Sequence, residues 1–256
     1  MSFRATKAIV RGVSRSYDVY SKPHAPISVE RAAKQHALYV DALRSTGLQL
    51  VVVPADHDKP DCVFVEDTAV VWENQSLICR LNPNRDGEKA VVADLLRKTH
   101  RVHVVTAPGA LEGGDVLHTD DLTYVGISTR TNEEGAEQLA RFLAPFGRKV
   151  ITVPVTRCLH LKTGATYLGN ATMLVAPNLM EAGCFAGSRI LETAPGEDGA
   201  ANILHLPGSL AIAAGYPSTE HRLRDFAAEH GLQTIRLDVS EFAKADGSLT
   251  CLSIIW

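Results

Sequence analysis

A cysteine near the C-terminus is the first residue in this sequence that could do covalent chemistry. Cys251 stands in the tail DGSLTCLSIIW, where a turn at Asp246-Gly247 leads into an apolar segment, and we expect that segment to be a strand. A thiolate in this place is a nucleophile, but a lone cysteine on an apolar strand is more often a buried core residue. A catalytic role requires a histidine to move protons and a carboxylate to orient that histidine.

An acidic segment could supply the carboxylates. The sequence DCVFVED at 61–67 places Asp61, Glu66 and Asp67 around an apolar run. On a strand, Asp61 and Asp67 would face one side and Glu66 the other. A solvated turn is the plain alternative for acids alone. The apolar run favours burial instead, and buried acids need a cationic partner or strong hydrogen bonds.

Two further segments carry polar groups beside glycines or leucines. EGGD at 112–115 combines Glu112 with paired glycines, which permit a sharp turn or a close approach of the backbone. His160 lies between two leucines in CLHLKTG, where a core histidine bonded to a carbonyl oxygen is the common alternative. Arg85 and Arg130 precede predicted helices, a position that suits binding of a carboxylate, although each alone is also a plausible surface charge.

Other catalytic classes lack their motifs here. The sequence contains no G-x-S-x-G, no H-E-x-x-H, no Walker loop and no G-x-G-x-x-G. Lys162-Thr163-Gly164 matches the K-T-G of β-lactamases, but no S-x-x-K accompanies it. The remaining set of a cysteine, a histidine and several carboxylates favours a thiol-based enzyme.

The composition indicates an ordinary globular protein. The 256 residues are 45% hydrophobic and 21% charged with a formal net charge of −3, and no low-complexity linker divides them, so we expect one domain over 1–256. Scattered Lys and Arg residues argue against nucleic-acid and membrane partners. No signal peptide or bilayer-spanning apolar run is visible. Five widely spaced cysteines without a C-x-x-C favour reduced thiols in the cytoplasm over disulfides or a zinc site.

The elements that must position these groups repeat with a period of about 50 residues. A strand-strand-helix-strand unit recurs about five times, which predicts a radial α/β arrangement in which neighbouring units bury one another's faces. We expect the last strand to return and complete the first unit. Strands are predicted at 3–13, 48–53, 67–73, 76–80, 102–106, 115–118, 122–127, 149–153, 201–205, 209–213 and 233–238, and helices at 28–47, 88–98, 132–144 and 217–230.

Several local features complete this prediction. Ser28 caps the first helix, whose apolar stripe is predicted to contain Ala33, Ala37, Val40 and Leu43. A turn at 74–75 joins two strands. The unit at 165–193 has a poor helix signal. The polar, proline-bearing loop at 14–27 is long enough to form a lid or a binding loop.

Together the motifs resemble dimethylarginine dimethylaminohydrolase, a family of the guanidino-group-modifying superfamily. FVED preceded by Asp61, EGGD, RTNEEG from Arg130, LHLKTG from Leu159 and the terminal DGSLTC match in order along essentially the whole chain. The resemblance implies the pentein fold, a five-bladed α/β propeller of ββαβ modules around a central active-site channel. It also implies hydrolysis of Nω,Nω-dimethyl-L-arginine and Nω-monomethyl-L-arginine to citrulline plus dimethylamine or methylamine, without metal or organic cofactor.

The resemblance also implies roles for individual residues. Cys251 is expected to be the nucleophile that forms an S-alkylthiouronium intermediate, His160 the general acid and base, and Glu112 the carboxylate that bonds both His160 and the substrate. The expected substrate-binding residues are Asp67 at the guanidinium, Asp61 near the α-amino end, Arg85 and Arg130 at the α-carboxylate, and Phe64 and Glu66 nearby. The segment 81–87 departs from the family's pattern, and the loop 14–27 matches its lid only in placement and proline content.

Three alternatives stay open from the sequence. Arginine deiminases use a similar Cys/His/Glu set but are usually longer, with a helical insertion that is not visible here. Amidinotransferases are also longer and need an acceptor amine. A non-catalytic propeller that acts as a binding module would not need Cys251, His160 and Glu112 together, and usually carries a charged patch. The sequence also leaves a homodimer open.

Overall fold

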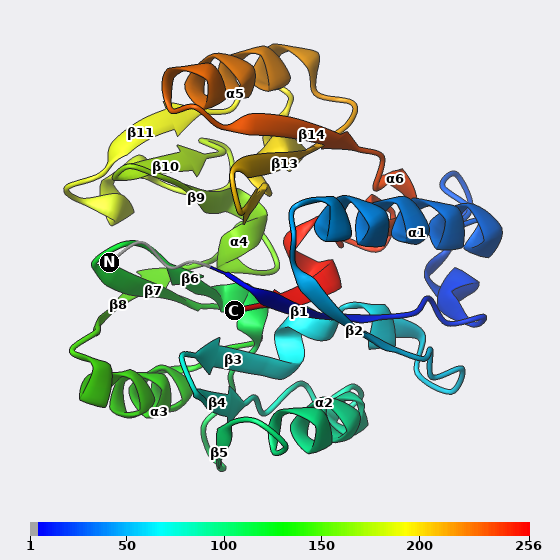
Figure 1. The fold of residues 1–256 in the computed structure, drawn as a ribbon, viewed down its shortest axis with the longest axis vertical. Coiled ribbons are helices and arrows are strands. Elements are labelled where there is room, and N and C mark those ends of the chain that lie inside the picture. Colours follow the sequence, from blue (N-terminus) through cyan, green and yellow to red (C-terminus); the bar gives the residue numbers. More distant parts are fainter. Residues whose placement is uncertain (1–4) are drawn as a thin grey trace.

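The computed structural model describes residues 5–256, which contain five separate sheets of three strands each (Figure 1). In every sheet the middle strand pairs antiparallel with one neighbour and parallel with the other. A parallel pair requires a crossover, and a helix or helical turn supplies it in each module. The predicted α/β architecture, a five-module propeller-like arrangement, is therefore confirmed.

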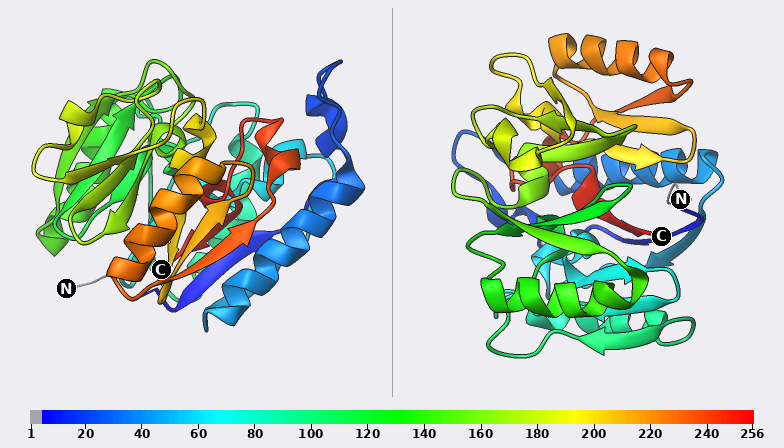
Figure 2. Two further views of the ribbon diagram at one scale, coloured as in Figure 1. Left: turned by 90° about the horizontal axis from the view of Figure 1, so that it is seen from above. Right: turned by 90° about the vertical axis from the view of Figure 1, so that its left-hand side faces the viewer.

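The modules follow one another along the chain. The second to fifth consist of β3 (Ala69–Trp72), β4 (Gln75–Ile78), α2 (Lys89–Leu96) and β5 (Arg101–Val104); β6 (Val116–His118), β7 (Leu122–Ile127), α3 (Glu133–Leu143) and β8 (Lys149–Pro154); β9 (Ala165–Gly169), β10 (Thr172–Val175), η7 (Ala182–Phe185) and β11 (Arg189–Glu192); and β12 (Leu204–Leu206), β13 (Ser209–Ala213), α5 (Pro217–Glu229) and β14 (Gln233–Leu237). The helices α1, α2, α3 and α5 lie around the outside of the ring (Figure 2).

The two ends of the chain close the first module. β15 (Ser253–Ile255) pairs antiparallel with β1 (Lys7–Arg11), with Ile9 opposite Ile254, and β1 pairs parallel with β2 (Gln49–Val53) across α1 (Val29–Ser45). The predicted return of the last strand is confirmed. Residues 3 and 4 of the predicted first strand lie outside the described residues.

The first helix is capped as predicted, but its buried face differs. The Ser28 hydroxyl accepts a hydrogen bond from the Arg31 backbone at 3.2 Å, and Gly47 follows the helix with φ of 85°. Ala33 and Ala37 are exposed, so that part of the predicted stripe was wrong. Gln35, His36 and Tyr39 lie on the buried face, so a pattern of hydrophobic residues alone does not identify it. That face consists of Ala32, Gln35, His36, Tyr39, Val40, Ala42 and Leu43.

Two local expectations have different outcomes. The weak helix signal at 165–193 corresponds to η7, a single turn of 3₁₀ helix in place of a longer helix. The turn predicted at 74–75 is displaced by one residue, because Glu73, with φ of 51°, and Asn74 form it and Gln75 already begins β4. Among residues 5–256, no helix combines the length and apolarity that a membrane crossing requires.

Candidate active site

Short turns from four parts of the chain meet near the centre of the ring. η3 (Val65–Thr68) contacts both η5 (Gly113–Asp115) and η9 (Thr250–Leu252), and η5 contacts α4 (Leu161–Gly164). Each of these segments carries or adjoins one of the predicted site residues. The fold therefore brings together four motifs that are far apart in the sequence.

Neither Cys251, which was predicted to lie on a strand, nor the segment 61–67, for which a strand and a turn were both considered, has strand structure. Residues 61–67 form 3₁₀ turns, η2 (Pro60–Val63) and η3, and Cys251 lies in η9, directly before β15 rather than on it. Pro60 begins the first turn, since its ring fixes a φ that suits the first position of a helical turn. Val63 and Val65 are fully buried at the centre, so the apolar run reflects burial and not a strand.

The paired glycines allow the close approach that the sequence predicted. A Cβ atom on Gly113 would lie 2.1 Å from the carbonyl oxygen of Glu66. A Cβ atom on Gly114 would lie 2.7 Å from the His160 ring. Side chains here would push η5 away from both η3 and the imidazole.

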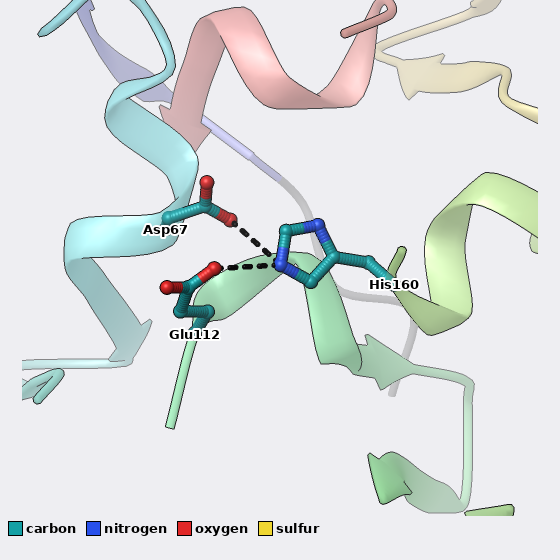
Figure 3. A group of neighbouring side chains, drawn as sticks. All are labelled: Asp67, Glu112 and His160. Carbon is teal, nitrogen blue, oxygen red and sulfur yellow. Dashed lines mark hydrogen bonds and ion pairs between the residues drawn. The ribbon is translucent and has the colours of Figure 1, made fainter. Parts of the chain in front are cut away.

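The imidazole of His160 lies against two carboxylates (Figure 3). Its Nε2 is 2.7 Å from Glu112 Oε2 and 3.9 Å from Asp67 Oδ1. Burial alone would lower the pKa of His160, but the charge of Asp67, then the hydrogen bond that His160 donates to Glu112, and then the charge of Asp115 outweigh it and raise the pKa to about 9. The ring is therefore an imidazolium at neutral pH and can give a proton to a departing group.

Asp67 is held ionised by its neighbours. Its Oδ1 accepts a hydrogen bond from the Gly114 backbone at 3.0 Å, and its Oδ2 accepts one from Arg85 at 2.7 Å. Burial would raise the pKa of Asp67, but His160 and Arg85 together lower it below its ordinary value. Arg85 also binds Glu88 at 2.9 Å and lies 3.7 Å from Asp61, so it neutralises a group of acids.

A cavity of about 240 Å³ collects almost all the predicted residues. Glu66 is the exception and does not line it. The cavity is lined by Asp61, Phe64, Asp67, Arg85, Glu112, Arg130, His160 and Cys251, together with Tyr20, Lys22, Leu159, Lys244, Ala245, Asp246 and Gly247. A larger surface groove of about 730 Å³ between β5 and α3 contains none of the predicted residues.

The thiol of Cys251 is protonated in this environment. Burial, followed by the nearby charges of Glu66 and Asp67, raises its pKa to about 12. Glu66 acts from behind the cavity, because its Oε1 binds the Lys162 ammonium at 2.5 Å and its Oε2 accepts the Thr250 hydroxyl at 2.9 Å. A cation placed in the cavity would favour the thiolate.

Comparisons with known proteins identify the family. The family model for eukaryotic N,N dimethylarginine dimethylhydrolase matches residues 14–183. An N(G),N(G)-dimethylarginine dimethylaminohydrolase of Streptomyces coelicolor is 37% identical over 88% of this chain and 89% of its own. One from Pseudomonas aeruginosa is 32% identical over 97% of this chain and 95% of its own. The chain belongs to the dimethylarginine dimethylaminohydrolase family.

The fold of this family member agrees with a solved relative. A cysteine-to-serine variant of the Pseudomonas aeruginosa dimethylarginine dimethylaminohydrolase, complexed with citrulline, superimposes with a TM-score of 0.92. The match covers 99% of this chain and 100% of the other, at 31% identity. The pentein fold predicted from the resemblance is therefore confirmed.

The loop 14–27 contributes two side chains to the lining of the cavity. The Tyr20 hydroxyl donates to Asp61 Oδ2 at 2.7 Å, and Lys22 also lines the cavity. Tyr17 packs edge-on against Phe64. Only the length and proline content of the loop predicted a lid or a binding loop here, and no motif identified Tyr20 or Lys22. Lys244 also went unpredicted, and it donates to the Pro26 carbonyl at 2.6 Å and so ties the loop to the C-terminal segment.

The same carboxylate–histidine group has a spacing that a metal ion could use. One ligand atom each from Asp67, Glu112 and His160 lies within 4.8 Å of the others. A metal ion would have to displace the proton that these acids hold on His160 and share Asp67 with Arg85. The residues present are therefore better suited to an organic cation and a proton than to a resident metal.

Proposed function

We propose that this chain hydrolyses Nω,Nω-dimethyl-L-arginine, and also Nω-monomethyl-L-arginine, to L-citrulline plus dimethylamine or methylamine. The observation that carries the proposal is the convergence of Cys251, the His160–Glu112 pair and Asp67 on one cavity. The complex of a relative with citrulline supports the product. The methylated guanidinium would lie against Asp67 and Glu112, which offset its positive charge.

The charges of the cavity support a reaction in which the substrate activates the nucleophile. The guanidinium stabilises the thiolate of Cys251, whose proton leaves to solvent as the substrate binds. The thiolate attacks the guanidinium carbon and forms a neutral tetrahedral adduct. The imidazolium of His160 then protonates the methylated nitrogen, the C–N bond breaks and the amine departs. A cationic S-alkylthiouronium remains on Cys251.

The second half of the reaction restores the enzyme. The now neutral His160 takes a proton from water, and the hydroxide adds to the thiouronium carbon. The C–S bond breaks, and the hydroxyl proton of the adduct leaves to solvent as the carbonyl of citrulline forms. Citrulline is released, and the thiolate is regenerated beside the imidazolium. Arg130 and Arg85 would bind the α-carboxylate of the substrate, and Asp61 would bind its α-amino group. These two contacts would set the distance from the backbone of the substrate to its guanidinium.

A citrulline assay tests this proposal and separates it from its alternatives. The purified protein is incubated with arginine, monomethylarginine, asymmetric dimethylarginine and symmetric dimethylarginine. We expect citrulline from monomethylarginine and asymmetric dimethylarginine. Citrulline from arginine alone would assign the chain to deiminase chemistry, and none from any of the four would favour a binding module.

Variants assign the roles. Cys251→Ser should abolish turnover while substrate binding stays measurable, and His160→Gly should stall or block the reaction. Cys184→Ser is the matched control, because that cysteine is partly buried in η7 and does not line the cavity. Normal citrulline production by Cys251→Ser would remove the thiol from the mechanism. A cytoplasmic location, one domain over 1–256 and the absence of a cofactor or of nucleic-acid and membrane partners stay predictions.

A further inference from the structure

Four polar side chains form a closed ring of hydrogen bonds behind the cavity. We call Glu66, Lys162, Asn202 and Thr250 the polar ring. Lys162 Nζ donates to Glu66 Oε1 at 2.5 Å, and the Thr250 hydroxyl donates to Glu66 Oε2 at 2.9 Å. Asn202 Nδ2 donates to Thr250 Oγ1 at 3.0 Å and to the Lys162 carbonyl at 2.9 Å, which closes the ring.

The ring joins the two segments that carry the reacting groups. Thr250 directly precedes Cys251, and Lys162 follows His160 by two residues on α4. Asn202 is the direct link, because its amide bonds the Lys162 carbonyl and both the hydroxyl and the backbone nitrogen of Thr250, the last at 3.0 Å. One side chain thus fixes the cysteine turn relative to the histidine segment.

Neighbouring segments hold Asn202 in place. Its side chain is 4% exposed, and it directly follows η8 (Asp198–Ala201). The hydroxyl of Thr166 on β9 donates to the Ala201 carbonyl at 2.5 Å and accepts from the Ile203 backbone at 3.4 Å. The backbone on both sides of Asn202 is therefore tied to a buried strand. The amide cannot follow a displaced Thr250 without breaking these contacts.

The polar ring holds one side of the cysteine turn, and the first helix holds the other. The Tyr39 hydroxyl donates to the Leu249 carbonyl at 2.9 Å and is 2.7 Å from the Ser253 hydroxyl. None of the four ring residues lines the substrate cavity. Glu66 and Lys162 instead line a separate cavity of about 80 Å³ with His118 and Ser253. The ring therefore acts on the reaction through the placement of Cys251 and not by touching the substrate.

We propose that the polar ring positions Cys251 against His160 and that Asn202 and Thr250 are positioning residues of the proposed hydrolase. The inference rests on the proposed function. A nucleophile must approach its electrophilic carbon within a narrow range of distance and angle, and a misplacement of about 1 Å can cost about 100-fold in rate. The ring has a second effect, since the Lys162 ammonium offsets the Glu66 charge that faces Cys251 and opposes its ionisation.

Paired variants at residue 250 test the ring. Thr250→Val keeps the size of the side chain and the backbone bond to Asn202 but removes the hydroxyl that bridges Glu66 and Asn202. Thr250→Ser keeps that hydroxyl. We expect Thr250→Val to lower kcat by about 10- to 100-fold with KM changed less than about 3-fold, and Thr250→Ser to stay near the parent. Alkylation of Cys251 by 2-chloroacetamidine should be slower in Thr250→Val than in the parent, and near the parent rate in Thr250→Ser.

A remote control separates positioning from general destabilisation. Thr219 is fully buried and accepts a hydrogen bond from the Ala194 backbone at 2.8 Å. Neither residue lines the cavity. Thr219→Val should lower the unfolding midpoint and leave kcat and alkylation unchanged. Asn202→Ala should lower kcat and the alkylation rate as Thr250→Val does. The kcat of the double variant should lie within about 3-fold of that of either single variant, because the ring acts as a unit.

The outcomes distinguish this inference from the proposed function. If the parent protein produces no citrulline, the proposed function fails, and the ring is judged by the alkylation rates alone. If the parent is active but Thr250→Val keeps its kcat and its alkylation rate, the ring does not position Cys251. The same conclusion follows if Thr250→Val and Thr250→Ser lose activity equally, or if both lose only stability, as Thr219→Val does.

Discussion

The thiol of Cys251 should ionise only when a cation occupies the cavity. Its pKa of about 12, against an ordinary value of 9.0, results from burial and then from the charges of Glu66 and Asp67. That difference corresponds to about 4 kcal/mol against the thiolate. At pH 7 only about one molecule in 100,000 of the free enzyme would hold a thiolate.

A bound guanidinium supplies a free energy of the same size. A cation about 4 Å from the sulfur interacts with the thiolate by about 4 kcal/mol at the effective dielectric constant of about 20 that is typical near a protein surface. This attraction offsets the cost of ionisation, so the substrate itself can bring the pKa of Cys251 back to its ordinary range. Without the substrate the cysteine should be unreactive.

Alkylation at varied pH measures this effect. Iodoacetamide is neutral and should alkylate Cys251 in the free enzyme about tenfold faster for each pH unit from about 7 to 10, without a plateau. The cation 2-chloroacetamidine should react far faster at pH 7, after both rates are normalised to those of a small free thiol. Cys251→Ser gives the background from the other cysteines. A plateau of the iodoacetamide rate near or below pH 8 would mean that the free enzyme already stabilises the thiolate, and would refute the reasoning.

Three further predictions concern the groups around the cavity. Arg130→Met should raise KM with little change in the free energy of unfolding, because the Arg130 side chain is 27% exposed and its nearest acid lies as far as 4.0 Å away. Arg85→Met should lower the free energy of urea unfolding by about 3–5 kcal/mol, since it leaves buried acids without their cation. Equal stability of the two variants would contradict this. Gly113→Ala should cost more than about 2 kcal/mol because its Cβ would clash with a carbonyl oxygen, whereas Gly183→Ala, with nothing within 4 Å, should cost less than about 0.5 kcal/mol; similar unfolding midpoints would exclude the clash. The raised pKa of His160 stabilises the fold fully below pH 6.5, and this stability is lost as pH rises through about 9, so the free energy of unfolding should fall by about 3 kcal/mol over that window in the parent and not in His160→Gln; parallel pH curves would argue against the imidazolium.

The repeating modules could be predicted because their signals are local. The strands that contain β-branched runs, such as 122–127, and the helix at 133–143 with its Asn132 cap lie where the sequence placed them. The return of the last strand followed from the count of modules alone. The buried face of α1 could not be predicted in the same way, because Tyr39 contributes a hydroxyl to the cysteine turn and so is buried for a reason that a hydrophobic pattern does not record.

The residues of the cavity could be predicted and the residues that hold them could not. Cys251, His160 and Glu112 belong to short motifs, and the resemblance gave them roles. Asn202 stands in no such motif, and the motif that contains Thr250 does not reveal its partner, because the hydrogen bonds between the two join residues 48 positions apart. A polar side chain in a sequence does not reveal its partner when the partner comes from another module, because the fold decides which groups meet.

The segment 61–67 shows why local rules failed at the centre of the ring. Val63 and Val65 are completely buried and Phe64 is 6% exposed, so the run reads as a strand, yet its backbone forms two 3₁₀ turns. A strand here would place Phe64 with Glu66, on the face opposite Asp61 and Asp67, whereas the turns bring Asp61, Phe64 and Asp67 to the cavity while Glu66 lines a separate one. The irregular backbone is what brings Phe64 to the same cavity as the two acids, and regularity is most often given up where function requires such an arrangement. The segment that the sequence left open between a strand and a turn is therefore the place where the chain departs from its own repeat to build a site.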